Sequence, residues 1–393
     1  MRTVTRTRAE YRPFGRETWR DPYPLYRRLR DEDPVHRSPG GYWVLTRFQH
    51  VFDAARDTAT FSSAHGLTFD DESANLGVQT MVFMDPPEHT RYRRLVSRGF
   101  TPRNVERLEP ALRARVREHV DAMRDAGSGD FVASLARPVP SWVVAHYLGV
   151  PESDRFRFDR WTQAIVQGHD DAGSAADAVA DLSEYFAALV EAKRVEPGDD
   201  VVSDLIRADE AGHGIGPAGI LGMAFVMIAG GNDTTTGLLA GAAELLTSCP
   251  DERARLLDDP SLVPNAVDEL LRLTSPVQGL CRVALSDATV DGATIPAGDR
   301  VLLCYGAANR DPREFGADAE ELDVGRTFDR FLTFSVGSHF CLGAAATRLQ
   351  GRVVLEELLR ALPNFTVDAD AGVFADGGFT RRYESLPFDA ASP

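Results

Sequence analysis

The sequence predicts a mainly α-helical protein with small β-sheets. Most of residues 85–275 carry helical patterns, whereas strand patterns are few and short. An apolar stretch from Pro217 to Ser248 ends before Pro250 and predicts one long helix. At about 1.5 Å per residue this helix would extend about 48 Å, enough to cross the molecule. Shorter helices around one long central helix are therefore the expected framework.

Other elements are expected where start signals and apolar periodicity coincide. The run Asp85-Pro86-Pro87-Glu88 predicts a helix start, with Asp85 as the capping residue. The remaining expected helices are Pro110–Arg124, Asp177–Lys193, Pro264–Leu273 and a last helix from about Cys341 to Pro363. The expected strands are Tyr42–Leu45, a hairpin of Ala288–Gly292 with Thr294–Gly298, and Arg300–Cys304.

Length and composition indicate a large acidic protein. The 393 residues are 43% hydrophobic and show no break or linker, so we expect one domain over residues 1–393 with a poorly ordered arm at 1–15. The formal charge of -16 argues against general nucleic-acid binding. The N-terminus lacks an apolar secretory segment, and the longest strongly apolar run, Ile220–Ala229, is shorter than the roughly 20 residues of a membrane span. A cytoplasmic protein that does not enter a membrane is expected.

The segment from Phe334 to Gly343 is the most informative in the chain. Its glycines permit a tight turn and a close approach to a flat group. Cys341 is expected where this turn becomes a helix, and the free N–H groups of a helix start stabilise a thiolate. An isolated cysteine would be interpreted as a packing residue, but the spacing Phe-x-x-Gly-x-His-x-Cys-x-Gly favours a thiolate ligand of a metal. The other three cysteines form no Cys-x-x-Cys pair, which disfavours a disulfide framework or a zinc ribbon.

On this loop and several separate motifs, the chain resembles the cytochrome P450 family from about Asp21 to Phe388. The resemblance implies the P450 fold, with haem b (iron protoporphyrin IX) buried between the long central helix and the helix of the cysteine loop. Cys341 then matches the proximal ligand of the haem iron. Ser335 departs from the family pattern, because most bacterial members have glycine there, and Phe331 stands where many have histidine. Serine is small enough for the turn, so the departures bear on haem packing more than on ligation.

His89 and Arg93 are four residues apart on an expected helix and therefore share one face. By the resemblance, these two residues bind the haem propionates together with Arg282 and with His339 of the cysteine loop. Recognition of carboxylates by guanidinium groups explains the residue types. The alternative is an ordinary solvated basic face.

Three more arginines, Arg91, Arg94 and Arg98, lie on a different face of the same helix. They form either a solvated surface or a docking patch for an acidic electron donor. In the second case, association should weaken as salt is added.

The middle of the long helix carries Gly230-Gly231-Asn232-Asp233-Thr234-Thr235. Two glycines cost roughly 2 kcal/mol of helix propensity, and Asn, Asp and Thr compete for backbone groups. A local widening of the helix is therefore expected, although a close helix crossing would also explain the glycines. By the resemblance, Asp233 and Thr234 are the acid and alcohol that relay protons to the oxygen-binding face.

Glu269 and Arg272 share a helix face at a spacing of three residues. Alone they would form a solvated surface pair. The resemblance implies a buried scaffold pair completed by Arg326, with a role in folding and not in chemistry.

The resemblance implies a monooxygenase that inserts one oxygen atom of O2 into a lipophilic molecule by hydroxylation or epoxidation. A polyketide, terpenoid, steroid or aromatic compound is the expected substrate class. The chain carries no flavin or nicotinamide motif, so electrons are expected from a ferredoxin and its reductase, with NAD(P)H acting only through them. The enzyme is expected to be a monomer. The expected substrate contacts are Ala229, Gly230, Val277, Leu280 and Phe379.

Three other functions stay open. The first is a peroxide-driven haem peroxygenase, which the intact Asp233-Thr234 pair disfavours. The second is a non-enzymatic member of the fold that activates a partner glycosyltransferase, which Cys341 disfavours. The third is a haem-based gas sensor, which predicts neither a substrate-induced spin change nor a product.

Overall fold

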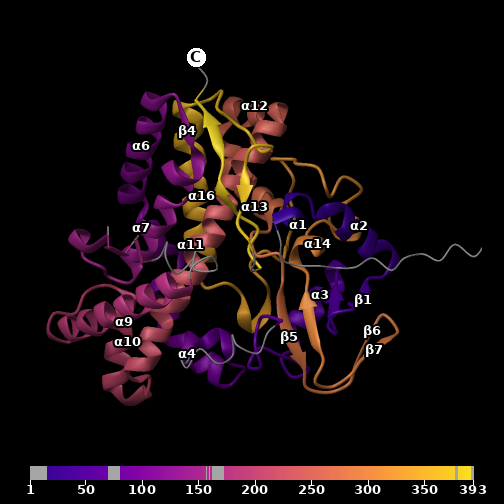
Figure 1. The fold of residues 1–393 in the computed structure, drawn as a ribbon, viewed down its shortest axis with the longest axis horizontal. Coiled ribbons are helices and arrows are strands. Elements are labelled where there is room, and N and C mark those ends of the chain that lie inside the picture. The colour runs from indigo at the N-terminus through magenta and orange to yellow at the C-terminus, as the bar shows by residue number, and fades with distance from the viewer. Residues whose placement is uncertain are drawn as a thin grey trace, which may run out of the picture.

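The computed structural model describes residues 16–69, 80–155, 157–158, 160–161, 172–376 and 379–390. The arm expected at residues 1–15 lies outside this part of the chain. Helices dominate one side of the molecule, and the largest sheet lies on the other side (Figure 1). The predicted fold class, mainly α with small β-sheets, is confirmed.

The helices closely follow the predicted ones, with ends that differ by a few residues. The longer helices are α2 (Tyr23–Glu32), α3 (Phe48–Arg56), α4 (Glu88–Val96), α6 (Glu109–Ala126), α7 (Pro138–Tyr147), α9 (Ala172–Val195), α10 (Val201–Ala208), α11 (Gly216–Ser248), α12 (Pro250–Asp258), α13 (Val263–Thr274) and α16 (Ala344–Ala361). The shorter ones are α1 (Arg16–Arg20), α5 (Pro102–Glu106), α14 (Tyr305–Ala308) and α15 (Pro312–Phe315). Single 3₁₀ or π turns are η2 (Met81–Phe83), η3 (Ser97–Phe100), η4 (Val132–Ala136), η5 (Glu152–Asp154), η6 (Asp209–His213), η7 (Pro260–Leu262) and η8 (Gly337–His339).

The largest sheet has five strands in the order β1-β2-β8-β5-β3. These strands are β1 (Val35–Arg37), β2 (Trp43–Leu45), β3 (Phe61–Ser62), β5 (Leu280–Ala284) and β8 (Arg300–Leu303). Strands β2 and β8 are parallel, with Val44 opposite Leu302, and the other neighbours are antiparallel. The smaller sheets are formed by β4 (Ser128–Asp130), β12 (Pro387–Asp389) and β9 (Thr366–Val367), by the hairpin β6 (Ala288–Val290) and β7 (Ala293–Ile295), and by β10 (Val373–Phe374) with β11 (Tyr383–Ser385).

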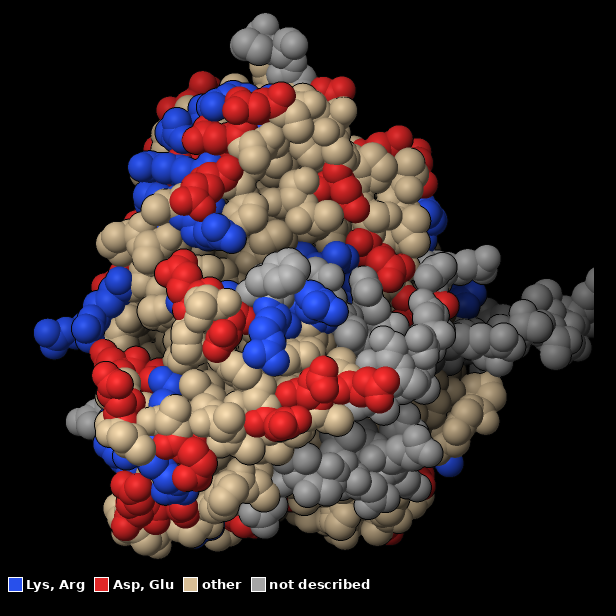
Figure 2. Space-filling model, turned by 60° about the vertical axis from the view of Figure 1, so that its left-hand side comes forward, with Lys and Arg blue, Asp and Glu red and all other residues tan. Residues whose placement is uncertain are grey.

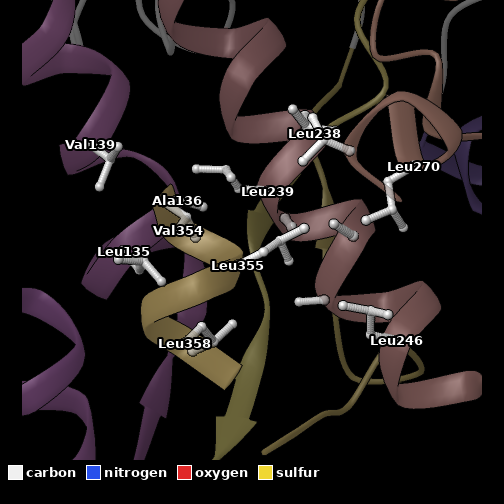
Figure 3. Close-up of a cluster of buried hydrophobic side chains, with 14 of the residues drawn as sticks. Leu135, Ala136, Val139, Leu238, Leu239, Leu246, Leu270, Val354, Leu355 and Leu358 are labelled. Atoms are coloured by element: carbon white, nitrogen blue, oxygen red, sulfur yellow. The ribbon is translucent and has the colours of Figure 1, made fainter. Parts of the chain in front are cut away.

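The central helix α11 is held by a hydrophobic cluster drawn from distant parts of the chain (Figure 3). Leu238 and Leu239 of α11 belong to this cluster together with Val139 of α7, Leu270 of α13 and Leu355 of α16. Burial of each such side chain stabilises the fold by about 1.5–3 kcal/mol. Since four helices share the cluster, residues on α11 have well-defined positions relative to the cysteine loop before α16.

The glycine-rich middle of α11 differs from its prediction. The helix runs without interruption from Gly216 to Ser248, so the expected local widening was wrong. A Cβ atom on Gly231 would lie 2.7 Å from Cγ2 of Val144 on α7, and close crossing of the two helices therefore explains this glycine. Outside α11 itself, no described residue has an atom within 4 Å of a Cβ placed on Gly230.

The start of α4 also differs from its prediction. Pro87 is the N-cap residue, and among the described residues no side chain caps this helix. The Asp85 carboxylate instead accepts hydrogen bonds from the Ser62 hydroxyl and from the Ser63 backbone N–H at 2.9 Å. Asp85 was therefore wrongly predicted to cap, because its carboxylate connects the segment before α4 to β3.

Surface charges of both signs are interspersed on the face shown in Figure 2. Between α6 and α16, Arg113 forms ion pairs with Glu356 at 2.5 Å and Glu357 at 2.8 Å. Such pairs join two helices that are far apart in the sequence. Among the described helices, a segment able to cross a membrane is not found.

Candidate active site

Cys341 lies in a tight loop immediately before α16 and packs against the cluster around α11. Its backbone N–H donates to the Phe334 carbonyl at 2.8 Å, which closes the loop. The helix begins at Ala344, three residues later than the sequence predicted, with Gly343 as its N-cap. Burial raises the pKa of the Cys341 thiol, whereas the Gly343 N–H and the Arg93 guanidinium act to lower that pKa. The thiolate therefore has donors in place, and a bound cation would complete its stabilisation.

Ser335 has φ 55°, in the left-handed region that favours glycine. The buried side chain accepts a hydrogen bond from the Tyr305 hydroxyl at 3.3 Å. The turn thus retains the conformation that glycine would adopt, and Tyr305 gives the serine hydroxyl a partner.

The two small substitutions at this position separate backbone strain from the lost hydrogen bond. Ser335→Gly relieves a strain of about 1 kcal/mol but loses the Tyr305 contact, worth a similar amount, so stability should change by less than about 1 kcal/mol. Ser335→Ala loses the contact and retains the strain, and should lower the free energy of unfolding by about 1–2 kcal/mol more than glycine does. Urea denaturation followed by circular dichroism measures both. Equal stabilities of the two variants would show that the backbone is not strained.

Phe331 packs within an aromatic group beside the cysteine loop. Its ring lies 5.7 Å from that of Phe334, between centroids. The Cζ atom of Arg348 lies 5.6 Å from the centroid of the Phe331 ring and 4.8 Å from that of the Phe334 ring. Arg348 also acts to lower the pKa of Cys341. Phe331, which stands where many family members have histidine, therefore packs against a cation that is close to the sulfur.

The structure brings together the four residues expected to bind propionates. His89 and Arg93 lie on α4, Arg282 on β5 and His339 on η8. The imidazole rings of His89 and His339 are 4.2 Å apart, and Arg93 Nη1 donates to the Ser338 carbonyl at 3.3 Å. Burial, reinforced by the Arg282 charge, lowers the pKa of His339 to about 3. These side chains therefore form one cluster next to the cysteine loop, in which the two arginines carry the positive charge and the imidazole of His339 is neutral.

This cluster is short of acceptors among the residues that the structure describes. Arg282 is 2% exposed and donates to the Cys281 carbonyl at 2.7 Å. The buried atoms His89 Nδ1 and His339 Nε2 have no hydrogen-bond partner in the described chain. Buried polar groups without partners are costly, and buried cations more so. A dianionic ligand with two carboxylates fits these donors, so the residues present fit haem.

The expected relay residues lie in the middle of α11. Asp233 Oδ2 is 3.0 Å from Nε of Arg382, and the Thr234 hydroxyl donates to the Gly230 carbonyl at 2.8 Å. One turn earlier, Ala229 and Gly230 are exposed, although the neighbouring turns of the helix are largely buried. Ile228 shares a hydrophobic cluster with Leu342 of the cysteine loop. The relay segment and the cysteine loop therefore adjoin the same part of the interior.

Two of the expected substrate contacts, Val277 and Phe379, lie where the chain before β5 meets the C-terminal segment, residues 379–390. Val277 forms a β-bridge with Thr380, and the Gln278 N–H donates to the Phe379 carbonyl at 2.8 Å. Val277 and Leu280 are partly buried against one hydrophobic cluster. Ala229 and Gly230 belong to α11, and the C-terminal segment reaches that helix through Arg382.

The scaffold residues form a buried ionic group. Glu269 accepts from Nε and Nη2 of Arg272, both at 2.7 Å, and both side chains are 0% exposed. Arg326 Nε adds a third contact to Glu269 at 3.1 Å. Arg272 Nη1 also donates to the Asn309 carbonyl at 2.7 Å. The group therefore joins α13 to the irregular chain that precedes the cysteine loop.

Two charged residues of the site were missed in the sequence. Arg382 contacts Asp233, and Arg348 covers the aromatic group beside Cys341. Arg382 gave no signal beyond its place in the pair Arg381-Arg382, because only the fold brings the C-terminal segment to α11.

Comparison with known proteins agrees with this geometry. The sequence model of the cytochrome P450 family matches residues 243–373. Cytochrome P450 130 of Mycobacterium tuberculosis is 51% identical, over 98% of both chains. Vitamin D(3) 25-hydroxylase of Pseudonocardia autotrophica is 34% identical, also over 98% of both. The solved structure of cytochrome P450 PksS of the Bacillus subtilis bacillaene polyketide synthase matches with TM-score 0.89 and 31% identity, over 97% of this chain and 100% of that one.

The chain therefore belongs to the cytochrome P450 family. It is an enzyme of the monooxygenase class, and its family uses haem and O2.

Proposed function

We propose that this chain is a haem-thiolate monooxygenase in which Cys341 ligates the iron of haem b. His89, Arg93, Arg282 and His339 bind the propionates. The observation that carries the proposal is the meeting of a loop thiol with a cluster of two arginines and two histidines, in which His89 Nδ1 and His339 Nε2 have no hydrogen-bond partner in the described chain. Haem held by a thiolate supplies the binding and cleavage of O2.

The protein's own residues supply orientation and protons. The two guanidinium groups bind carboxylates, while the N–H groups at the start of α16 moderate the charge on sulfur. Asp233 and Thr234 deliver protons from α11. The Thr234 hydroxyl donates to the Gly230 carbonyl, so its oxygen can accept a hydrogen bond from a donor beside it.

The proposed substrate is a moderately large lipophilic molecule: a polyketide, terpenoid, steroid or aromatic compound. The partly buried apolar residues Val277, Leu280 and Phe379 support this class. The named relatives act within the same range, since one is a vitamin D(3) hydroxylase and another belongs to a polyketide synthase.

Electrons are proposed to come from a ferredoxin and its reductase to a monomeric enzyme. Arg91 and Arg94 on α4 are exposed and support docking of an acidic donor. Arg91 also donates to the His213 carbonyl at 3.2 Å. The side chain of Arg98, the third arginine of the predicted patch, lies outside the described part of the chain.

The test compares two sources of oxidising equivalents on the purified holoenzyme. Candidate lipophilic compounds are first screened for a low-spin to high-spin change of the haem spectrum. Product is then measured with O2, a surrogate ferredoxin system and NADPH, at low and high salt, and separately with hydrogen peroxide. Higher turnover with the ferredoxin system, falling with salt, supports the proposal. Higher turnover with peroxide would replace it with a peroxygenase, and a protein with no spin change and no product would be a sensor.

The relay role of Asp233 and Thr234 predicts a loss of rate without a loss of haem. Asp233→Asn should lower turnover by about 10²-fold, because general acid–base groups contribute about 10²–10⁴-fold. Thr234→Ala should divert consumed O2 to hydrogen peroxide. The turnover rate measures the first effect, and product formed per O2 consumed measures the second. Thr247→Ala, distant on the same helix, is the control and should leave both quantities unchanged. A normal turnover rate in Asp233→Asn would contradict the role.

A further inference from the structure

We propose that Arg382 is a positioning residue that orients the Asp233 carboxylate, an inference that rests on the proposed relay role of Asp233. Arg382 Nε lies 3.0 Å from Asp233 Oδ2, and the two side chains are 8% and 25% exposed. A guanidinium keeps its proton in proteins, so Arg382 cannot take part in the transfer itself. It acts on the relay through the position of the acid.

The backbone of both partners is held firmly. The Arg382 carbonyl accepts from the Ala375 N–H at 3.0 Å, and the Arg381 N–H donates to the Pro276 carbonyl at 2.7 Å. Gly237 follows Asp233 by about one turn of α11, and a Cβ there would lie 2.8 Å from the Arg381 carbonyl oxygen. The C-terminal segment therefore lies directly against this face of α11. The direction from which Arg382 approaches the carboxylate is set by the fold.

A second guanidinium stands near the pair. Arg137, at the N-terminus of α7, donates to the Glu384 carbonyl at 3.0 Å. Burial and then the Arg382 charge lower the pKa of Arg137, while Asp130, Asp233 and Glu384 act to raise it. Asp233 thus lies between charged groups of α7 and of the C-terminal segment. Positive charge surrounds the Asp233 carboxylate, and the hydrogen bond from Arg382 sets the direction in which this carboxylate points.

The neighbouring Arg381 provides a matched comparison. It is also buried, but its Nε donates to the Trp19 carbonyl at 2.7 Å, and Nη2 lies 3.6 Å from Glu244. Arg381 therefore anchors the same segment to the N-terminal helix α1 and to a more distant turn of α11. Loss of Arg381 removes a buried cation from the segment without removing the contact to Asp233.

The segment also contacts the proposed substrate residues. Thr380 bridges Val277, and the Phe379 carbonyl accepts from Gln278. Arg382 follows these contacts by two to three residues. A molecule that contacts Phe379 is therefore close, along a short stretch of chain, to the residue that orients the acid.

The test uses the full-length holoenzyme and needs no organic substrate, because the reduction of O2 by two electrons to hydrogen peroxide takes up two protons. Wild type, Arg382→Gln, Arg382→Lys, Arg381→Gln and Asp233→Asn are supplied with O2, NADPH and an excess of the surrogate ferredoxin system, which delivers both electrons. O2 consumption per haem is followed from about pH 6 to about pH 8, in H2O and in D2O. Crystal structures of the oxidised holoproteins record the rotamer of Asp233.

We expect Arg382→Gln to slow O2 consumption about tenfold and to change the pH profile and solvent isotope effect of that consumption in the direction of Asp233→Asn. Its Asp233 side chain should adopt another rotamer, and Arg382→Lys should restore part of the rate. Arg381→Gln should lower the thermal midpoint and leave the pH profile unchanged. If Arg382→Gln fails to fold, Arg382→Lys carries the test, because it keeps the charge and loses the Nε contact.

Two outcomes would overturn the proposal in different ways. If Asp233→Asn changes the pH profile but Arg382→Gln or Arg382→Lys matches Arg381→Gln, with Asp233 in its wild-type rotamer, Arg382 is only structural and the relay survives. If Asp233→Asn itself leaves the profile and the isotope effect unchanged, the proposed relay fails, and the role of Arg382 fails with it.

Discussion

Cys341→Ala is expected to abolish the thiolate signature of the haem and to reduce monooxygenase turnover to background. Removal of groups that merely support a metal ligand typically costs about 10–100-fold, so removal of the proposed ligand itself should exceed that range. None of the other described cysteines is placed to replace Cys341 as the ligand. Cys249 lies at the C-terminal end of α11, Cys281 lies on β5, and Cys304 directly follows β8. The reduced carbon-monoxide complex provides the measurement, since its absorption maximum distinguishes thiolate from other ligands.

Cys249→Ala is the matched control for this experiment. Cys249 and Cys341 are both partly buried, and both pack against the cluster that surrounds α11. Cys249 is the C-cap residue of α11 and does not belong to the loop that contains Gly337 and Gly343. We expect the control to bind haem with the wild-type spectrum. A wild-type spectrum in Cys341→Ala would overturn the assignment of the ligand.

Glu269→Ala is expected to lower the free energy of unfolding by about 3–5 kcal/mol. The substitution leaves Arg272, which is fully buried, without its carboxylate, and it also removes the contact to Arg326. Uncompensated buried charge accounts for this cost. The loss is a large part of the roughly 5–15 kcal/mol by which proteins are usually stable. Urea denaturation of haem-loaded protein, followed by circular dichroism, measures the difference.

Glu118→Ala removes a surface pair of the same spacing. Arg115 and Glu118 on α6 are 3.0 Å apart, also at i and i+3, but their side chains are 46% and 66% exposed. Solvent screens such pairs, and the control should cost less than about 1 kcal/mol. Similar losses in Glu118→Ala and Glu269→Ala would show that burial does not decide the contribution of the scaffold pair.

Many of the helices and strands could be predicted because apolar periodicity and the residues that end helices are local properties of the sequence. Apolar residues and the prolines around them located α11 and α13 to within one residue at each end. The β6–β7 hairpin followed from its turn residues for the same reason. The predictions for Asp85 and for the middle of α11 were wrong because each depended on a distant partner. The Asp85 carboxylate accepts hydrogen bonds from Ser62 and Ser63 and does not cap α4. The close approach of Val144 explains Gly231 without any widening of α11.

The sequence by itself determined the family resemblance, the helical framework and the residue types of the candidate site. It could do so because the spacing around Cys341 and the i, i+4 relation of His89 and Arg93 are short-range. Only the tertiary structure decided which distant groups meet. It buried Glu269 and Arg272, brought Arg282 to the two histidines and placed Arg382 against Asp233. Contacts between residues far apart in the chain depend on packing across the whole core, which no local pattern specifies.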